Sequence, residues 1–309
     1  MKMTLTMKKR IKKGMKGWLS ALPFIMPGLI LVAVFIIYPM LFTIKISFSD
    51  YRIVTGEITN VGLLNFKNVL FETKDFWYAY RNNFLYALVT VPLIIFGGLI
   101  FSYLVNNLKK GQSIFKVGFY LPVITSWVIV SLVFKYMFGN SNTGLMNYLL
   151  VDVFHILDEY VPWLYREWTG NGAIWLMGVW KNMGWAMLIF LAALQSIPIE
   201  LYESASIDGA GLWDKFRFIT IAAVKPTIYF VMVNMIIGSF NVFIQVMLLT
   251  SGNPNGTTSV LQYLLYNRAF NKFEFGEASA IGLISAVTIV LLTIILNKAF
   301  LLDRNGNGE

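Results

Sequence analysis

The sequence predicts an all-α polytopic membrane protein with about six transmembrane helices. Of its 309 residues, 57% are hydrophobic and only 13% are charged, whereas a soluble domain carries about 25% charged residues. Long uncharged stretches alternate with short basic ones. Aromatic residues make up 16% of the chain, which favours side chains seated at membrane interfaces. Lipid is therefore the solvent that this much apolar surface requires.

Six stretches are long and apolar enough to cross about 30 Å of hydrocarbon. The expected spans are Leu19–Ile44, Phe84–Val105, Val117–Phe138, Gly172–Ser196, Pro226–Leu249 and Ala278–Leu302. The first is too long for the core of a signal peptide, and no small-residue cleavage site follows it, so we expect a retained helix.

The spans divide the chain into four parts. We expect a basic tail at 1–17, a first helix with an outer loop at 18–81, a core of five helices at 82–302 and a short tail at 303–309.

Basic residues gather on the cytoplasmic side of membrane proteins. Seven Lys and Arg precede the first span and three more lie in 106–116, whereas 139–171 is acidic. Both termini are therefore expected in the cytoplasm, and the same distribution argues against nucleic-acid binding.

Several kinds of site are excluded by residue usage. The chain has no Cys and a single His155, so thiol catalysis and Cys- or His-rich metal sites are not expected. A phosphate-binding loop ending in Gly-Lys-Ser/Thr is also missing, because no Gly-Lys dipeptide occurs. We therefore expect no enzymatic activity, no metal and no cofactor in this chain.

The segment Glu200–Pro226 is amphipathic although it lies between two spans. Its apolar residues follow a helical spacing, and Asp208–Gly209 is a turn signal in the middle. The pattern predicts two short helices bent at Gly209. The residues alone leave two interpretations open, which are a docking element for another protein and a loop lying passively on the headgroups.

This segment resembles the "EAA" loop of ABC-importer permeases. The resemblance lies in Glu203-Ser204-Ala205, Asp208-Gly209-Ala210, Phe216 to Ile221 and Lys225-Pro226. Further residues resemble the carbohydrate-importer branch, namely Asn65-Phe66, Asn82, Tyr120-Leu121-Pro122, Gly144 to Asn147, Trp180, Gly184, Leu194 to Pro198, Thr250, Pro254 and Thr257. The chain departs from the family pattern at Ser204, Ala222 and Asn253.

The resemblance implies a type I ABC importer permease fold with a cytoplasmic coupling helix in the loop 197–222. It implies a prokaryotic plasma membrane and four kinds of partner: a second homologous permease, two cytoplasmic ATP-binding subunits, an extracellular solute-binding protein and the lipid bilayer. ATP and Mg would be used by the ATP-binding subunits. The implied coupling residues are Glu203, Ser204, Ala205, Asp208, Gly209, Ala210, Trp213 and Phe216.

Polar and aromatic groups inside the spans are candidates for a carbohydrate path, because buried polar groups in lipid face a partner helix or water. Asn241 and Gln245 are expected one turn apart on one helix face, beside Phe240. The full candidate set is Trp180, Asn182, Met183, Gly184, Met187, Phe240, Asn241 and Gln245. Contacts between helices are the alternative role for these amides.

Transport driven by an ion gradient is the rival function. A secondary transporter of a small polar solute would normally hold carboxylates at mid-membrane, and none of the six expected spans has Asp or Glu in its interior. We therefore expect the permease subunit of an ATP-driven importer, with an oligosaccharide as the solute.

Overall fold

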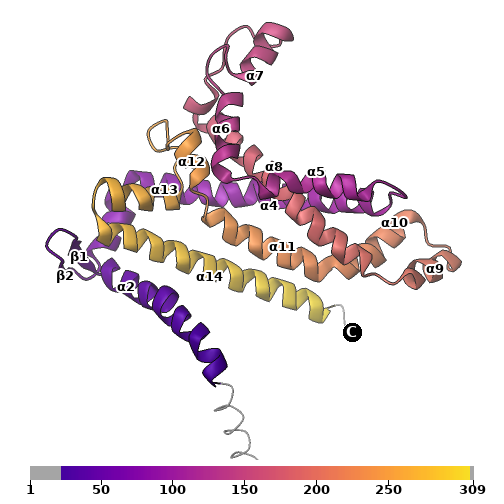
Figure 1. Ribbon diagram of the computed structural model, residues 1–309, viewed down its shortest axis with the longest axis horizontal. Helices are drawn as coiled ribbons and strands as arrows, with labels where there is room; N and C mark the ends of the chain where they lie inside the picture. The colour runs from indigo at the N-terminus through magenta and orange to yellow at the C-terminus, as the bar shows by residue number, and fades with distance from the viewer. Residues whose placement is uncertain (1–21, 307–309) are drawn as a thin grey trace, which may run out of the picture.

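The computed structural model describes residues 22–306, with side chains as far as Phe300 (Figure 1). The predicted basic tail 1–17 lies outside the described residues, as does the end of the predicted tail from 307. The first helix, Leu22–Ser47, contains η1 (Ala33–Ile37) and α2 (Tyr38–Ser47). The other elements are β1 (Ser49–Arg52), β2 (Glu57–Asn60), α3 (Leu64–Lys67), η2 (Asn68–Glu72), α4 (Lys74–Asn106), α5 (Gln112–Ile124), α6 (Trp127–Met137), α7 (Leu145–Asn147), η3 (Tyr148–Val153), η4 (Trp163–Tyr165), α8 (Glu167–Gln195), α9 (Ile199–Ile207), α10 (Leu212–Asp214), η5 (Lys215–Ile221), α11 (Ala222–Phe240), α12 (Ile244–Leu249), α13 (Leu261–Tyr266), η6 (Asn267–Asn271) and α14 (Phe275–Gly306).

The helices run between two ends of an elongated bundle. One end carries α9 and α10, and α14 finishes on the same side (Figure 1). The opposite end carries the antiparallel hairpin β1–β2, in which Ser49 pairs with Asn60. We call these the α9 end and the hairpin end. The hairpin was not expected in an all-α chain, and its turn contains Gly56 at a φ of 71°.

The prediction of about six spans is confirmed. Within the described residues, five helices are long and apolar enough to cross a membrane: Leu22–Ser47, Lys74–Asn106, Glu167–Gln195, Leu212–Phe240 and Phe275–Phe300. A sixth crossing is possible only if α5 and α6 together form one span. At 33 residues, α4 is about 50 Å long, so it continues well beyond the hydrocarbon layer.

Two predicted spans are broken, which corrects the expectation of continuous helices. The third expected span, Val117–Phe138, bends by 92° between α5 and α6. Pro122 lacks a backbone N–H, and the hydroxyl of Ser126 accepts a hydrogen bond from the N–H of Val128 at 3.3 Å, which caps the start of α6. The fifth expected span, Pro226–Leu249, is interrupted because α11 ends at Phe240 and α12 begins at Ile244.

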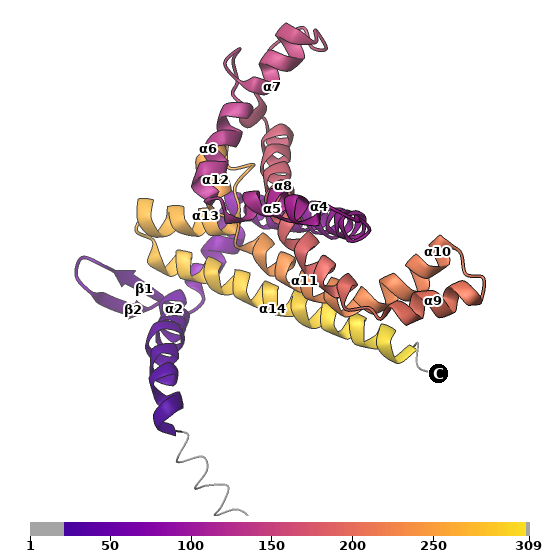
Figure 2. The ribbon, with the colours of Figure 1, turned by 45° about the vertical axis from the view of Figure 1, so that its right-hand side comes forward.

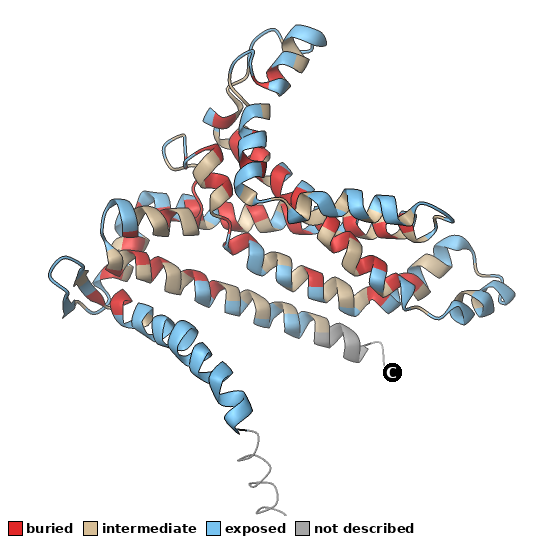
Figure 3. Cartoon of the chain, in the orientation of Figure 1, coloured by how far each residue is buried: buried red, intermediate tan, exposed pale blue. Residues whose placement is uncertain are grey.

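Helix α8 is the centre of the packed core. It lies against α4, α5, α6, α11 and α12, and 56% of its most apolar window is buried. The first helix is the opposite case, because none of its most apolar window is buried, and Figure 3 shows it exposed along most of its length, up to the buried Ile46 and Ser47 at its end. Apolar faces of this size on the outside of a bundle are typical of contact with lipid or with another membrane chain.

An ion-pair network closes the hairpin end. The Arg268 guanidinium contacts the carboxylates of Glu274 and Glu277 at 2.6 and 2.7 Å. It also donates to the Thr73 hydroxyl at 2.9 Å, and Glu277 accepts from Asn68 at 3.1 Å. The network therefore joins η6, the start of α14 and the segment that leads into α4.

Candidate functional site

The two short helices predicted between α8 and α11 are present as α9 and α10, and the chain bends between them at Gly209, as the sequence indicated. We call the segment from α9 to α10 the bracket. Helix α9 ends at Ile207, and Gly209 adopts a φ of 80°. The N–H of Ala210 donates to the carbonyl of Ala205 at 2.9 Å, and that of Gly209 donates to Ser206 at 3.2 Å. This pair of bonds is a Schellman motif, which needs a left-handed residue such as glycine just after the helix. Gly209 therefore sets the angle at which α10 follows α9.

The outer surface of the bracket is apolar and unusually exposed. Ile207, Leu212 and Trp213 are 87%, 81% and 69% exposed. Figure 2 shows α9 and α10 standing out from the bundle as an arm. Among the other predicted coupling residues, Glu203, Ser204, Asp208 and Gly209 are exposed, and Ala205 and Ala210 are half-buried. An exposed apolar patch rimmed by polar residues is typical of a protein-binding surface.

The base of the bracket is anchored to the bundle. The half-buried Phe216 ring lies 5.5 Å from the ring of Tyr103 on α4 and 5.8 Å from that of Trp213. Tyr202 and Thr220 share a hydrogen bond of 2.9 Å, and Lys215 donates to Ser206 at 2.8 Å. Phe216 is therefore part of the anchor, whereas Trp213 is part of the outer surface. A cavity of about 470 Å³ lies between the bracket and the ends of α4 and α8.

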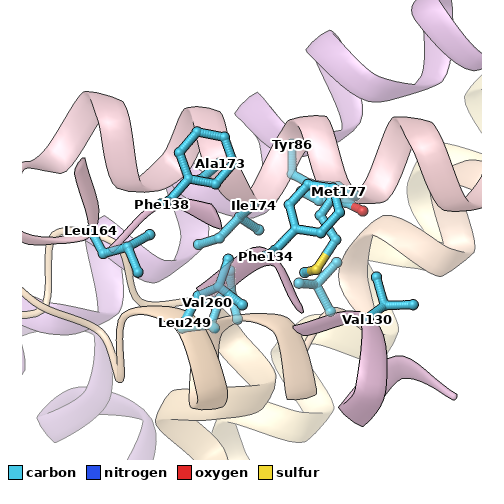
Figure 4. Close-up of a cluster of buried hydrophobic side chains, with 12 residues drawn as sticks. Tyr86, Val130, Phe134, Phe138, Leu164, Ala173, Ile174, Met177, Leu249 and Val260 are labelled. Atoms are coloured by element: carbon cyan, nitrogen blue, oxygen red, sulfur yellow. The ribbon is translucent and has the colours of Figure 1, made fainter. Parts of the chain in front are cut away.

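The two helix breaks lie near one another beside α8. The half-helix α6 packs against α12, which follows the second break, and both contact α8. Their contact contains the largest buried cluster, which includes Val130, Phe134, Met177 and Leu249 (Figure 4). Discontinuous helices of this kind surround the substrate sites of many transporters, because backbone outside a helix is tolerated at membrane depth only in protein or around water.

Trp180 and Met183 are the path candidates that line open space. They border a cavity of about 540 Å³ between α5 and α8, together with Phe115, Phe119 and Pro122. The Trp180 ring lies 5.8 Å from the Phe134 ring. Asn182 is half-buried, and its amide donates to the Gly178 carbonyl one turn earlier at 2.9 Å.

Three path candidates are packing residues in this structure. A Cβ atom on Gly184 would lie 1.8 Å from the carbonyl oxygen of Phe119, so Gly184 admits the backbone of α5 and not a solute. Met187 and Phe240 have no exposed surface. Phe240 packs edge-on against Phe84, with ring centroids 5.3 Å apart.

The expectation that Asn241 and Gln245 share one helix face is wrong. The second break separates them, because Asn241 follows the last residue of α11 and Gln245 lies in α12. Asn241 is exposed, and its amide donates to Ile237 at 2.9 Å. Gln245 is buried, and its side-chain oxygen accepts from the N–H of Phe243 at 3.1 Å, within the break itself. Of the two amides, only Asn241 is accessible.

Sequence reasoning noted Asn82 only as a residue that resembles the family, and it missed the structural role that Asn82 shares with Asn83 on α4. Asn82 donates to the carbonyls of Thr257 and Ser259 at 2.7 and 2.8 Å. Asn83 donates to Ser239 at 2.7 Å and accepts from the N–H of Leu261 at 2.9 Å. Two adjacent Asn at the start of an uncharged stretch were the available signal, because buried amides need fixed partners.

The segment between α6 and α8 stands apart from the bundle and carries acidic side chains. Tyr160 donates to Asp152 at 3.0 Å, and this hydrogen bond to a carboxylate raises the pKa of the Tyr160 hydroxyl. Within the described residues no three His, Cys, Asp or Glu gather as a metal-binding group would require.

Comparison with known proteins places this geometry in context. The model of a family described as "Binding-protein-dependent transport system inner membrane component" matches residues 82–302. The arabinooligosaccharides transport system permease protein AraP of Halalkalibacterium halodurans is 32% identical, over 88% of this chain and 83% of that protein. The trehalose/maltose transport system permease protein MalF of Thermococcus litoralis is also 32% identical, over 95% and 96% of the two chains.

A solved structure shows the same fold. The chain matches part of a bacterial ABC transporter involved in the import of the acidic polysaccharide alginate, with a TM-score of 0.81 and 23% identity. The match covers 94% of this chain and 98% of the other.

Proposed function

Because the chain belongs to the family of binding-protein-dependent transport system inner membrane components, we propose that it forms the translocation path of an ATP-driven carbohydrate importer. Oligosaccharide is the substrate class that the relatives support, since their names specify arabinooligosaccharides and trehalose or maltose. The solute would be delivered by an extracellular solute-binding protein, as the family description implies. This chain would hydrolyse no ATP and bind no cofactor itself.

The observation that carries the proposal is the exposed bracket α9–Gly209–α10. An ATP-binding subunit that closes on its nucleotide and Mg must push on the membrane chain through a stiff element. The bracket is short, its angle is set by the Schellman motif, and its base is pinned to α4 through Phe216 and Tyr103. Ile207, Leu212 and Trp213 present the apolar surface for a cleft in that subunit. Glu203, Ser204 and Asp208 form its polar rim.

The path itself is proposed to run beside α8, where the two broken spans meet. Trp180 and Met183 offer an aromatic face and an adaptable side chain along the cavity between α5 and α8. Asn241 and Asn182 add amide groups, which can hydrogen-bond hydroxyls. These groups suit an uncharged sugar surface, which has hydroxyls on its rim and C–H groups on its faces.

The proposed arrangement puts the α9 end in the cytoplasm. It follows from the basic residues at 106–116 and from the acidic segment at 139–171. A second permease of the same family would complete the path as a heterodimer, because in one chain the most apolar window of the first helix has no buried residue.

The test compares two glycines that share one backbone geometry. Gly209 and Gly56 both have positive φ, at 80° and 71°, and a Cβ atom meets nothing within 4 Å at either position. A β-branched residue is strained there, so Gly209→Val and Gly56→Val carry similar local costs. Only Gly209→Val is expected to lower solute-stimulated ATP hydrolysis, by about tenfold, which corresponds to about 1.4 kcal/mol of lost coupling.

The assay uses the assembled transporter in lipid nanodiscs, with its binding protein and a panel of oligosaccharides. Basal hydrolysis and membrane insertion should be unchanged in both variants. Normal solute stimulation in Gly209→Val would reject the bracket as the coupling element, and stimulation by no saccharide in the wild type would reject carbohydrate import.

A further inference from the structure

Lys181 is a buried cation in the middle of α8 with an unusual set of partners. Its side chain is 5% exposed. The ammonium donates to the carbonyls of Pro122, Val123 and Thr125, at 2.8, 3.1 and 2.6 Å. All three carbonyls belong to the last turn of α5 or to the break before α6. The ammonium also lies 4.8 Å from the ring of Trp127, the first residue of α6.

These carbonyls need a donor from elsewhere because the helix stops there. The last four carbonyls of any helix lack an N–H partner, and lipid supplies none. The C-terminal end of a helix also carries partial negative charge, which favours a cation. Within the described residues Lys181 forms no ion pair with a carboxylate. The carbonyl dipoles and the indole ring therefore compensate its charge.

Without the ammonium, one other arrangement would satisfy the same carbonyls. A continuous helix from Gln112 to Met137 would give Pro122, Val123 and Thr125 the N–H groups of the residues four positions later. The two helices are apolar enough together to pass as one span. The bent and the straight form thus differ in which groups donate hydrogen bonds to these three carbonyls. Lys181 donates to them only in the bent form.

We propose that Lys181 is a positioning residue that keeps the α5–α6 span broken. In the bent form α6 packs on α12, and its Phe134 ring meets the Trp180 ring at 5.8 Å. Straightening would carry α6 away from both. The effect on Trp180 matters for transport only if the proposed function holds, whereas the control of the bend by Lys181 does not depend on it.

The experiment measures the bend directly. The chain has no cysteine, so Ile114→Cys and Tyr136→Cys can carry a pair of spin labels at exposed positions on α5 and α6. At 1.5 Å per residue, the labelled backbone positions are about 33 Å apart in a straight helix and about 22 Å apart at a right-angled bend. Distances are measured by pulsed electron paramagnetic resonance on the full-length chain in nanodiscs.

The short distance is expected for the wild type and for Lys181→Arg, which keeps a cationic donor. Lys181→Met, of similar length but without donors, is expected to shift the distribution by about 10 Å toward the straight value. Lys135→Met is the matched control, because it removes an exposed lysine of α6 and should leave the distance unchanged.

A loss of folding alone would not produce this shift, since a purely structural lysine would lower the yield and leave the distance of the recovered protein unchanged. If Lys181→Met cannot be recovered, Lys181→Gln replaces it and is expected to give a mixture of both distances. The short distance alone in the recovered variant would overturn the proposal. No substrate, ATP or partner is required, so this failure would be distinct from a failure of the transport assay.

Discussion

Gly184→Ala is a sharp test of how α8 meets α5. A Cβ at this position would lie 1.8 Å from the carbonyl oxygen of Phe119 and 2.7 Å from its carbonyl carbon. The closest ordinary contact between such a carbon and an oxygen is about 3.3 Å, so the helices must separate by about 1.5 Å. The obstacle is backbone, which cannot rotate aside. Overpacking of this kind costs about 1–3 kcal/mol.

Gly172→Ala is the matched control on the same helix. A Cβ at Gly172 meets nothing within 4 Å, and alanine is favoured over glycine inside a helix by about 1 kcal/mol. The two substitutions are chemically identical, yet the thermal midpoint in nanodiscs should fall for Gly184→Ala and stay or rise for Gly172→Ala. A change of 1 kcal/mol corresponds to about 2–4 °C for a chain of this order of size.

The result also separates two roles for Gly184. If the glycine only let a sugar approach the backbone, alanine would weaken uptake and leave the midpoint unchanged. Equal midpoints for Gly184→Ala and Gly172→Ala would therefore refute the packing argument and restore the path role.

Three further outcomes are expected. Asn82→Ala leaves the carbonyls of Thr257 and Ser259 without their donor and should cost about 1–3 kcal/mol in thermal stability. Asn107→Ala should cost much less, because the hydrogen bond of its side-chain amide to the Tyr103 carbonyl is exposed. Equal losses of stability in the two variants would contradict this. Arg268→Met removes the ion pairs with Glu274 and Glu277 at the hairpin end and should cost about 2 kcal/mol. Arg52→Met, whose pair with Asp50 is exposed, should cost below about 1 kcal/mol, and a reversed order would contradict the network. Trp180→Ala should raise the solute concentration for half-maximal uptake about fivefold, which corresponds to a loss of about 1 kcal/mol of aromatic contact. Trp168 is exposed at the start of α8, so Trp168→Ala should leave uptake unchanged. The opposite pattern would remove Trp180 from the path.

The parts of the fold that depend on local sequence were predictable. Uncharged stretches of about 20 residues located the spans, because the thickness of the bilayer sets their length. The bracket was also predictable, since Asp208–Gly209 combines a turn former with a residue that tolerates positive φ. Both features need only neighbouring residues.

The breaks and the buried amides depend on residues far apart in the chain. Pro122 and Thr125–Ser126 are tolerated inside membrane helices when a neighbour supplies donors, and here the donor is Lys181, almost 60 residues later. The burial of Met187 and Phe240 likewise depends on α4, α5 and α14, which pack around them. An apolar residue in a span looks the same in sequence whether it faces lipid, a path or another helix.

The amides of Asn82 and Asn83 have a consequence for motion. Together they form four hydrogen bonds, which join α4 to Ser239 near the end of α11 and to the segment 257–261 at the start of α13. Because these bonds hold buried backbone groups, separating the three segments would strand several donors and acceptors at once. Any motion of the bundle is therefore expected to carry these three segments as one rigid block, and to bend the chain at Asn241–Phe243, where helical hydrogen bonds are already interrupted.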